Sequence, residues 1–167
     1  MMKNVVPDSQ VLFIVFFCFV VAPSEAETFE FNRRVSNVVL NEINTRRVAH
    51  GRNALRLNKI LCQVAQKHAE DMEKNNFFSH HSPQNGSLQD RIKTTSYSYR
   101  TIGENLLAGY LSPLSVVNAW MKSAKHRVTI LEEAYREIGI GYVGVSKVSD
   151  KRSKGPYWVT VFGASSN

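Results

Sequence analysis

Twelve consecutive apolar residues near the N-terminus divide the chain into two unlike parts. The run covers residues 11–22 (VLFIVFFCFVVA), is preceded by Lys3 and is followed by P-S-E-A at 23–26. Small residues three and one positions before residue 27 complete the anatomy of a secretory signal peptide. Twelve residues span about 18 Å as a helix, well short of the roughly 30 Å apolar core of a bilayer. We therefore predict a signal peptide over 1–26 and a secreted or periplasmic domain over 27–167, without a transmembrane anchor after cleavage.

This domain must fold around an ordinary hydrophobic core, because it cannot form an internal disulfide. Of the two cysteines, Cys18 lies in the apolar run and Cys62 remains. Without residues 1–26 the chain has 141 residues, with 20 basic and 12 acidic side chains and a net charge of +8. That length is enough for one domain with a sizeable core.

Apolar periodicity predicts an α+β fold. Helical spacing covers 33–49 and 59–74, and Ser112-Pro113 is a typical helix start. A turn-rich loop is expected over 75–86, with Ser87 as the cap of a short helix. Alternating apolar residues predict three strands, over 102–108, 138–148 and 157–162. This order of helices and strands is typical of a fold in which helices cover an antiparallel sheet.

Three segments carry residues that are suited to chemistry. His80 lies in the loop segment FFSHHSP, Glu104 in the apolar strand IGENLLAG, and His126 at the end of the helix that begins at Ser112-Pro113. A glutamate among apolar residues is costly unless it is paired or faces a cleft. Two imidazoles and one carboxylate are also the smallest set for a divalent metal with an open position. The alternative is that these are scattered surface histidines, while His68, on an apolar helix stripe, is expected to be a hydrogen-bonded core residue.

Five motifs in this order and spacing resemble one protein family. They are FFSHHSP, IGENLLAG, W-x-x-S-x-x-HR-x-x-IL, EIGIGYV and YWVTVFG. The resemblance is to the CAP superfamily (cysteine-rich secretory proteins, antigen 5 and pathogenesis-related 1), and within it to the short, disulfide-free bacterial SCP-domain or YkwD-like branch. It implies an α-β-α sandwich, with a central antiparallel sheet between helical layers, and secretion.

The resemblance also implies a cavity site. His80, Glu104 and His126 match the family's two histidines and strand acid, which bind zinc or another divalent cation in some members. The family's second acid falls on Ser123 here, which leaves the set one ligand short of a four-ligand metal site, and we expect Ser123 beside the ligand. His81 is an additional histidine next to this set.

Three functions follow as hypotheses. The favoured one is a non-enzymatic binding module, monomeric, whose cleft holds a small molecule, a lipid or a divalent cation. The second is a hydrolase in which metal-bound or His-activated water attacks an ester or peptide bond. The third is a cell-envelope interaction protein in which Glu104 only pins two loops.

The basic residues predict an anionic surface as a partner. One group, Lys151, Arg152 and Lys154, marks the loop before the last strand, and another, Arg91, Lys93 and Arg100, marks the central segment. Solvated faces account for such groups, and the partner expected for an exported domain is an anionic envelope polymer or lipid headgroup. No nucleic-acid-binding motif is present in the sequence, so nucleic acid is not expected.

Overall fold

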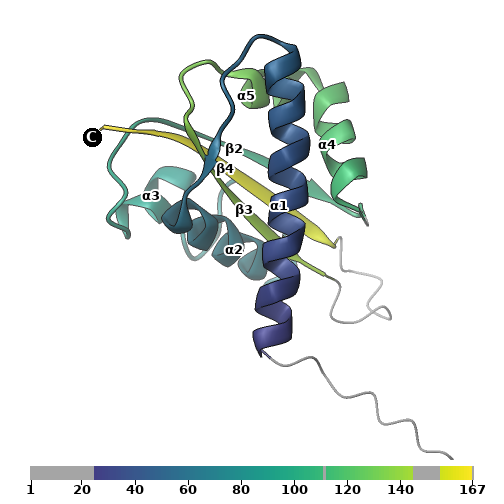
Figure 1. Cartoon of the computed structure of the whole chain (residues 1–167). Helices are drawn as coiled ribbons and strands as arrows, with labels where there is room; N and C mark the ends of the chain where they lie inside the picture. Colours follow the sequence, from purple (N-terminus) through teal and green to yellow (C-terminus); the bar gives the residue numbers. More distant parts are fainter. Residues whose placement is uncertain (1–24, 111, 145–154, 167) are drawn as a thin grey trace, which may run out of the picture.

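The computed structural model describes residues 25–110, 112–144 and 155–166 (Figure 1). Its elements, in chain order, are α1 (Glu25–Ala49), β1 (Arg56–Leu57), α2 (Lys59–Lys74), α3 (Leu88–Lys93), β2 (Tyr99–Ala108), α4 (Pro113–Lys122), α5 (Ala124–Leu131), β3 (Glu137–Val143) and β4 (Tyr157–Ser165). The predicted signal peptide lies outside the described residues, except for its last two residues, which begin α1. In this part of the chain, no helix combines the length and the apolar character needed to cross a membrane.

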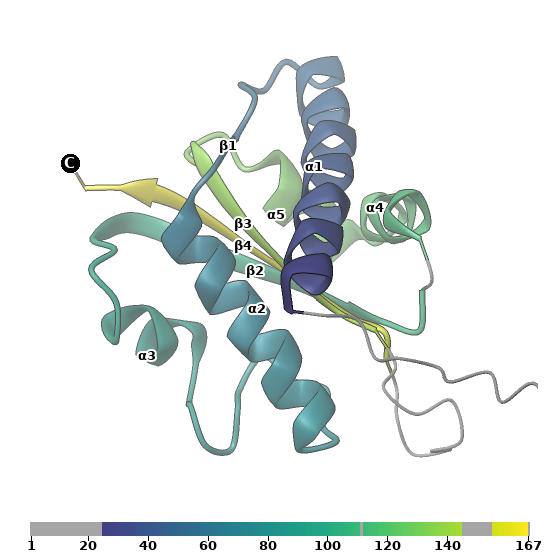
Figure 2. The ribbon, with the colours of Figure 1, turned by 60° about the horizontal axis from the view of Figure 1, so that its bottom comes forward.

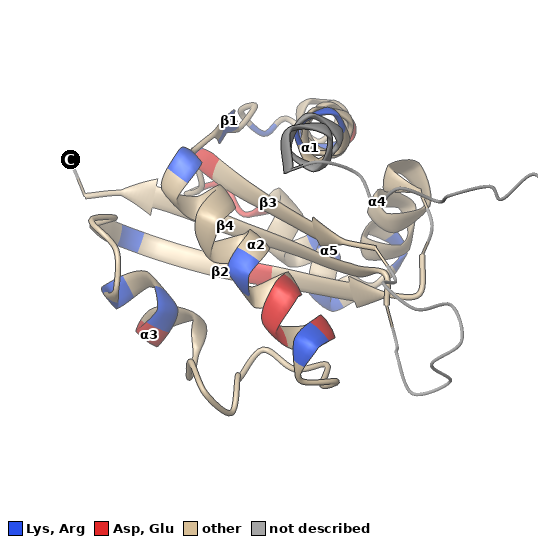
Figure 3. Cartoon of the chain, turned by 90° about the horizontal axis from the view of Figure 1, so that it is seen from below, with Lys and Arg blue, Asp and Glu red and all other residues tan. Residues whose placement is uncertain are grey.

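The fold is the predicted α-β-α sandwich. A four-stranded sheet has the order β1-β3-β4-β2, in which β4 pairs antiparallel with both β3 and β2. The short β1 adds a parallel pair at the outer edge of β3. Helices α1 and α4 lie side by side over one face of the sheet, and α2 and α3 lie under the other (Figures 2 and 3).

The central strand divides the core into two apolar clusters. Every residue of β4 except the last is buried, because strands flank it on both sides and helices cover both faces. Trp158 and Phe162 pack with α1, α4 and α5, whereas Val159 and Val161 pack with α2 and α3. The alternation along β4 therefore joins both helical layers to one strand.

The predicted helix starts are confirmed by their caps. The Asn58 side chain accepts from the Ile60 and Leu61 backbone N–H groups at the start of α2. Ser87 forms a capping box with Asp90 at the start of α3. Ser112 caps α4, with Pro113 in its first turn.

Several element boundaries differ from the sequence prediction, and two of these differences concern segments to which the sequence assigned functional residues. His126 does not end the helix that begins at Ser112-Pro113: the backbone of Ser123 is extended (φ −82°, ψ 121°), which ends α4 and starts the separate helix α5. The predicted strand 138–148 ends at Val143, and residues 145–154, including the basic loop, lie outside the described residues.

Helix α2 rests directly on the backbone of β3. A Cβ atom built on Gly139 would lie well within 3.0 Å of the carbonyl carbon of Leu61, and one on Gly141 would lie equally close to that of Ala65. Real Cβ atoms do not approach this closely, so only glycine permits this helix–strand distance. The I-G-I-G-Y motif therefore sets the position of α2.

We expect Gly139→Ala to lower the free energy of unfolding by about 3 kcal/mol, because the added methyl group forces α2 away from the sheet. Urea denaturation measures this change. Gly144→Ala is the matched control, since a Cβ there meets its nearest atom at 3.4 Å. Equal stability of the two variants would show that the close approach does not constrain α2.

Candidate functional site

The loop over residues 75–87, here called the histidine loop, joins α2 to α3 and carries His80. Asp71 on α2 anchors it: one carboxylate oxygen accepts from Ser82 Oγ at 2.6 Å and from Asn85 Nδ2 at 2.9 Å. The other oxygen accepts from Asn75 Nδ2 at 2.6 Å. Burial opposes ionisation of Asp71, but these donors outweigh it and hold its pKa below the usual range. The ionised carboxylate therefore fixes both ends of the loop.

His68 is the second anchor, and it is the hydrogen-bonded core histidine that the sequence predicts. It is fully buried, and its Nε2–H donates to the carbonyl oxygen of Ser79 at 3.0 Å. Its Nδ1 is buried without a hydrogen-bond partner. Burial lowers the pKa of His68, and the opposing effect of the Glu104 carboxylate does not cancel this. His68 is therefore neutral while it holds the loop.

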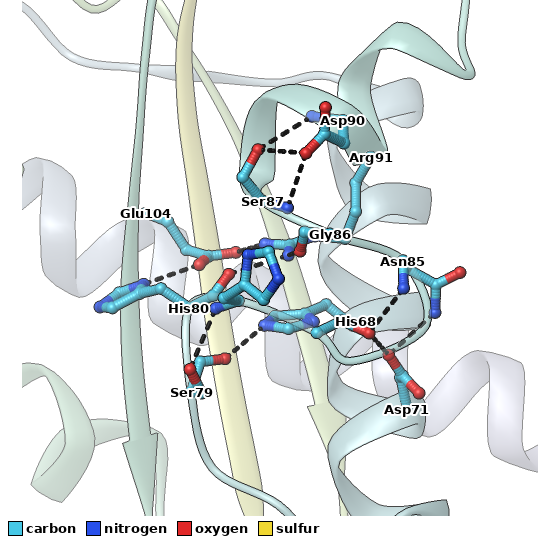
Figure 4. A network of polar contacts seen from close by, with 12 residues as sticks. His68, Asp71, Ser79, His80, Asn85, Gly86, Ser87, Asp90, Arg91 and Glu104 are labelled. Carbon is cyan, nitrogen blue, oxygen red and sulfur yellow. Dashed lines mark hydrogen bonds and ion pairs between the residues drawn. The ribbon is translucent and has the colours of Figure 1, made fainter.

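Glu104 on β2 orients the His80 ring. Its carboxylate Oε1 accepts from His80 Nδ1 at 2.7 Å, and its side chain is only 3% exposed whereas that of His80 is 61% exposed. Figure 4 shows the carboxylate between the His80 ring and Arg91, with the second ring nitrogen of His80 on the side away from Glu104. In neutral His80, Nδ1 bears the hydrogen that is donated to Glu104. Nε2 therefore has no hydrogen and presents a lone pair on the side away from the carboxylate.

Arg91 on α3 is the site residue that the sequence interpretation missed. The sequence places it on a solvated basic face with Lys93 and Arg100, but it is buried. Its Nη2 donates to Glu104 Oε2 at 2.5 Å, and its Nη1 donates to the carbonyl oxygens of His80 and Gly86 at 3.0 Å each. One guanidinium therefore neutralises Glu104 and fixes the backbone of His80. Because Arg91 is distant from His80 and Glu104 in the sequence, no local pattern indicates this contact.

His126 approaches the same place from the opposite helical layer. It lies in the first turn of α5, where its carbonyl oxygen accepts from Asn105 Nδ2 of β2 at 3.0 Å. Burial lowers the pKa of His126, and the positive charge that His80 can carry lowers it further. The two histidines are thus close enough to affect each other electrostatically.

His80 and His126 border a cleft of about 480 Å³, here called the imidazole cleft. Its lining residues come from the histidine loop, the end of β2 and α5: Phe78, Ser79, His80, His81, Leu106, Leu107, Ala108 and His126. Glu104 stands behind His80 and is not a lining residue. Ser123, which the family resemblance places beside the ligand, lies at the junction of α4 and α5 and is also outside this lining.

The predicted metal set does not fit a zinc ion in this arrangement. Sites of this kind supply at least three protein ligands. Among the described residues, no group of three or more His, Cys, Asp or Glu side chains is placed to hold a metal ion. Both oxygens of Glu104 are already engaged, by His80 and by a buried guanidinium. What the cleft offers is three histidines, His80, His81 and His126, beside an apolar wall.

Comparisons with known proteins agree with this architecture. The sequence model of the cysteine-rich secretory protein family (CAP) matches residues 40–162. In Bacillus subtilis (strain 168), YkwD is 37% identical over 122 residues, which are 73% of this chain and 45% of YkwD. The membrane protein YlbC of the same organism is 36% identical over 103 residues, 62% of this chain and 30% of YlbC. The chain thus spans less than half the length of these two relatives.

Solved structures show the same fold. An extracellular SCP-domain protein from Bacillus anthracis str. Ames matches with a TM-score of 0.73 and 24% identity, over 86% of this chain and 44% of that chain. An outer surface protein from Borrelia burgdorferi matches with a TM-score of 0.70 and 22% identity, over 80% of this chain and 94% of that chain. Both support the α-β-α sandwich.

Removal of the Arg91 guanidinium is expected to leave Glu104 as a buried, uncompensated carboxylate. We predict that Arg91→Met lowers the free energy of unfolding by about 3–5 kcal/mol. Lys93→Met, at an exposed position of the same helix, is the control and should change it by less than about 0.5 kcal/mol. Urea denaturation gives both values. Adding Glu104→Gln to Arg91→Met should recover part of the loss; no recovery would contradict a charge-based cause.

The lowered pKa of His68 predicts a pH dependence of stability. The unfolded chain protonates His68 at about pH 6.5, whereas the folded protein resists protonation. The stabilisation is therefore complete above about pH 6.5 and is lost as the pH falls towards the lowered pKa of the folded state. We expect the melting temperature to fall between about pH 7.5 and pH 5.

The control is His68→Gln, which keeps an N–H donor for Ser79 but does not titrate in this range. Its melting temperature should fall less over the same pH interval. If wild type and His68→Gln fall equally, another group determines the pH dependence.

Proposed function

The chain belongs to the cysteine-rich secretory protein (CAP) family, and on this premise we propose that it is a secreted, non-enzymatic binding module whose ligand occupies the imidazole cleft. One observation carries the proposal: Glu104 fixes the His80 ring so that its second nitrogen lies on the side away from the carboxylate. A buried ion pair with Arg91 in turn fixes Glu104. Such preorganisation lowers the entropy that binding would otherwise lose.

The lining residues indicate the ligand class. Phe78, Leu106 and Leu107 offer apolar surface, and His80 and His126 offer nitrogen atoms that accept or donate hydrogen bonds. Pockets of this size that combine a mostly apolar wall with a few polar groups are typical of ligand sites. The proposed ligand is therefore a molecule with an apolar part next to a polar or anionic group, such as a small molecule or a lipid.

The hydrolase is the second candidate, and the Glu104–His80 contact favours it. A carboxylate that orients an imidazole prepares a general base for an attacking water. In this mechanism, His80 Nε2 would accept a proton from water while Glu104 stabilises the charged ring. Ser79, the one hydroxyl among the lining residues, accepts from the His81 backbone N–H rather than contacting His80 in the manner of a nucleophile and its base. Binding therefore remains the favoured function.

Localisation outside the cytoplasm is part of the same proposal. Two solved neighbours are an extracellular protein and an outer surface protein. The apolar run at 11–22 and the sequence before Glu27 have the pattern of a cleaved signal peptide. With a net charge of +7 for the whole chain, an anionic envelope polymer or lipid surface is the proposed neighbour of the secreted domain.

The probe 8-anilinonaphthalene-1-sulfonate (ANS) tests the cleft, because it joins an apolar ring system to an anion. We expect saturable fluorescence enhancement that His80→Ala and His126→Ala each weaken by about tenfold. His50→Ala, at an exposed position just after α1, is the matched control and should bind as wild type does. Because burial lowers the pKa of His126, binding should tighten as the pH falls below about 6.5.

Circular dichroism of each variant shows that the fold is retained. Unchanged ANS binding in both cleft variants would contradict the proposed function. That result, together with a large loss of melting temperature in Glu104→Ala, would favour a purely structural role for the cluster.

A further inference from the structure

Neighbouring residues of β2 reach the two helical layers that border the imidazole cleft. Successive side chains of a strand point to opposite faces of the sheet. Glu104 points towards α2 and α3 and contacts His80 of the histidine loop. Asn105 therefore points towards the layer of α1, α4 and α5, where its Nδ2 donates to the carbonyl oxygen of His126 at 3.0 Å. Two consecutive strand residues thus each contact one histidine of the cleft.

The amide of Asn105 lies in an apolar layer. Asn105 is only 1% exposed, and Leu107 on the same face of β2 packs with the apolar cluster of α1. Burying an amide costs free energy unless it is hydrogen-bonded. An apolar residue would fill this position without that cost. The hydrogen bond to His126 is therefore the property that asparagine supplies here.

The start of α5 lacks a side-chain cap. Ser123 occupies the N-cap position, but its side chain makes no capping hydrogen bond to the helix. Arg127 Nη1 donates to the carbonyl oxygen of Met121 at 3.4 Å, a contact that is long and exposed to solvent. Asn105 is thus the buried donor that fixes the first turn of α5 to the sheet.

A second contact shows that α5 follows the same face of β2. A Cβ atom built on Gly103 would lie 3.3 Å from Cγ2 of Thr129, so the helix also packs closely at this position. Gly103 lies two residues before Asn105, on the same face of the strand. Thr129 lies three residues after His126, on the same side of the helix. Asn105 therefore fixes the start of a helix that rests along β2.

We infer that Asn105 is a positioning residue for His126, as Glu104 is for His80, so that β2 sets the separation of these two imidazoles. The inference rests on the proposed binding function, which gives His126 a ligand, and it names the residue that places His126 at the cleft. Loss of the Asn105 amide would release the first turn of α5 from the sheet. His126 would then lose burial, while Glu104 would still hold His80.

Asn105→Leu tests this inference, because leucine has a similar branched shape but no hydrogen-bond donor. The readout is an NMR titration of the His126 imidazole in the ligand-free protein. Burial is the main cause that lowers the pKa of this ring. We therefore expect the pKa of His126 to rise towards 6.5 in the variant.

Thr160→Val is the matched control. Thr160 lies directly opposite Asn105 on β4, is fully buried, and has a hydroxyl without a hydrogen-bond partner, so valine removes no bond. The titration of His126 in this control should match that of wild type. If Asn105→Leu does not fold, Asn105→Ser takes its place, since the serine hydroxyl is one bond shorter than the amide.

ANS binding is then compared in a double-mutant cycle of Asn105 and His126. Asn105→Leu alone should weaken binding by about threefold to tenfold, the range expected for one hydrogen bond. In the His126→Ala background it should have no further effect. A residue that only supports the fold would weaken binding by the same factor in both backgrounds. Circular dichroism at the assay temperature shows that each variant is folded.

The outcomes separate this inference from the proposed function. An unchanged His126 titration in the Asn105 variant overturns the inference, whatever the ANS result. An equal loss of ANS affinity with and without His126 also overturns it, because Asn105 would then act by another route. If the titration shifts but ANS binding depends on neither His80 nor His126, the binding function fails and the positioning role of Asn105 stands.

Discussion

The close approach of α2 to β3 is the constraint on which the site depends. Because Gly139 and Gly141 leave no side chain between helix and sheet, α2 lies at backbone contact distance from β3. The same helix carries His68 and Asp71, which hold the histidine loop through hydrogen bonds to its backbone and side chains. A shift of α2 would move both anchors together. The glycine spacing in one strand thus determines, through a helix and a loop, where the imidazole of His80 stands.

Charge neutralisation is the second requirement, and two neighbouring side chains meet it. Glu104 is almost fully buried, so its ionised form needs close partners. Arg91 supplies one and the His80 ring the other, on separate carboxylate oxygens. Since Arg91 also bonds the carbonyl of His80, the groups that neutralise the acid also position the histidine. The carboxylate is thereby kept out of the cleft, and the cleft presents imidazole and apolar surface.

Much of the fold and part of the site could be predicted from the sequence, and the features that could not be predicted have physical causes. Helix boundaries at Asn58 and Ser112 follow from local capping chemistry, which the sequence displays directly. The contact between His80 and Glu104 could be anticipated because a carboxylate in an apolar strand needs a partner. The burial of Arg91 could not be predicted, because it depends on how α3 packs against β2 and no local sequence pattern encodes that packing. The break at Ser123 has no local signal, because the residues on both sides of it favour helix.

Side chains from neighbouring helices cover backbone groups at both edges of the sheet. Past the short β1, the outer edge of β3 is covered by a side chain of α2: Gln66 accepts from the Tyr142 N–H at 3.0 Å and donates to its carbonyl oxygen at 3.1 Å. An amide side chain there takes the place of a neighbouring strand. Sheet edges that are left open invite pairing with other chains, so natural proteins usually cover them. On the opposite edge, the buried Trp120 indole of α4 donates to the Leu106 carbonyl at 3.1 Å, and the stretch from Leu106 to Ala108 borders the imidazole cleft. Side chains thus take up backbone groups at both edges, and beside β2 the cleft presents histidine side chains and apolar surface.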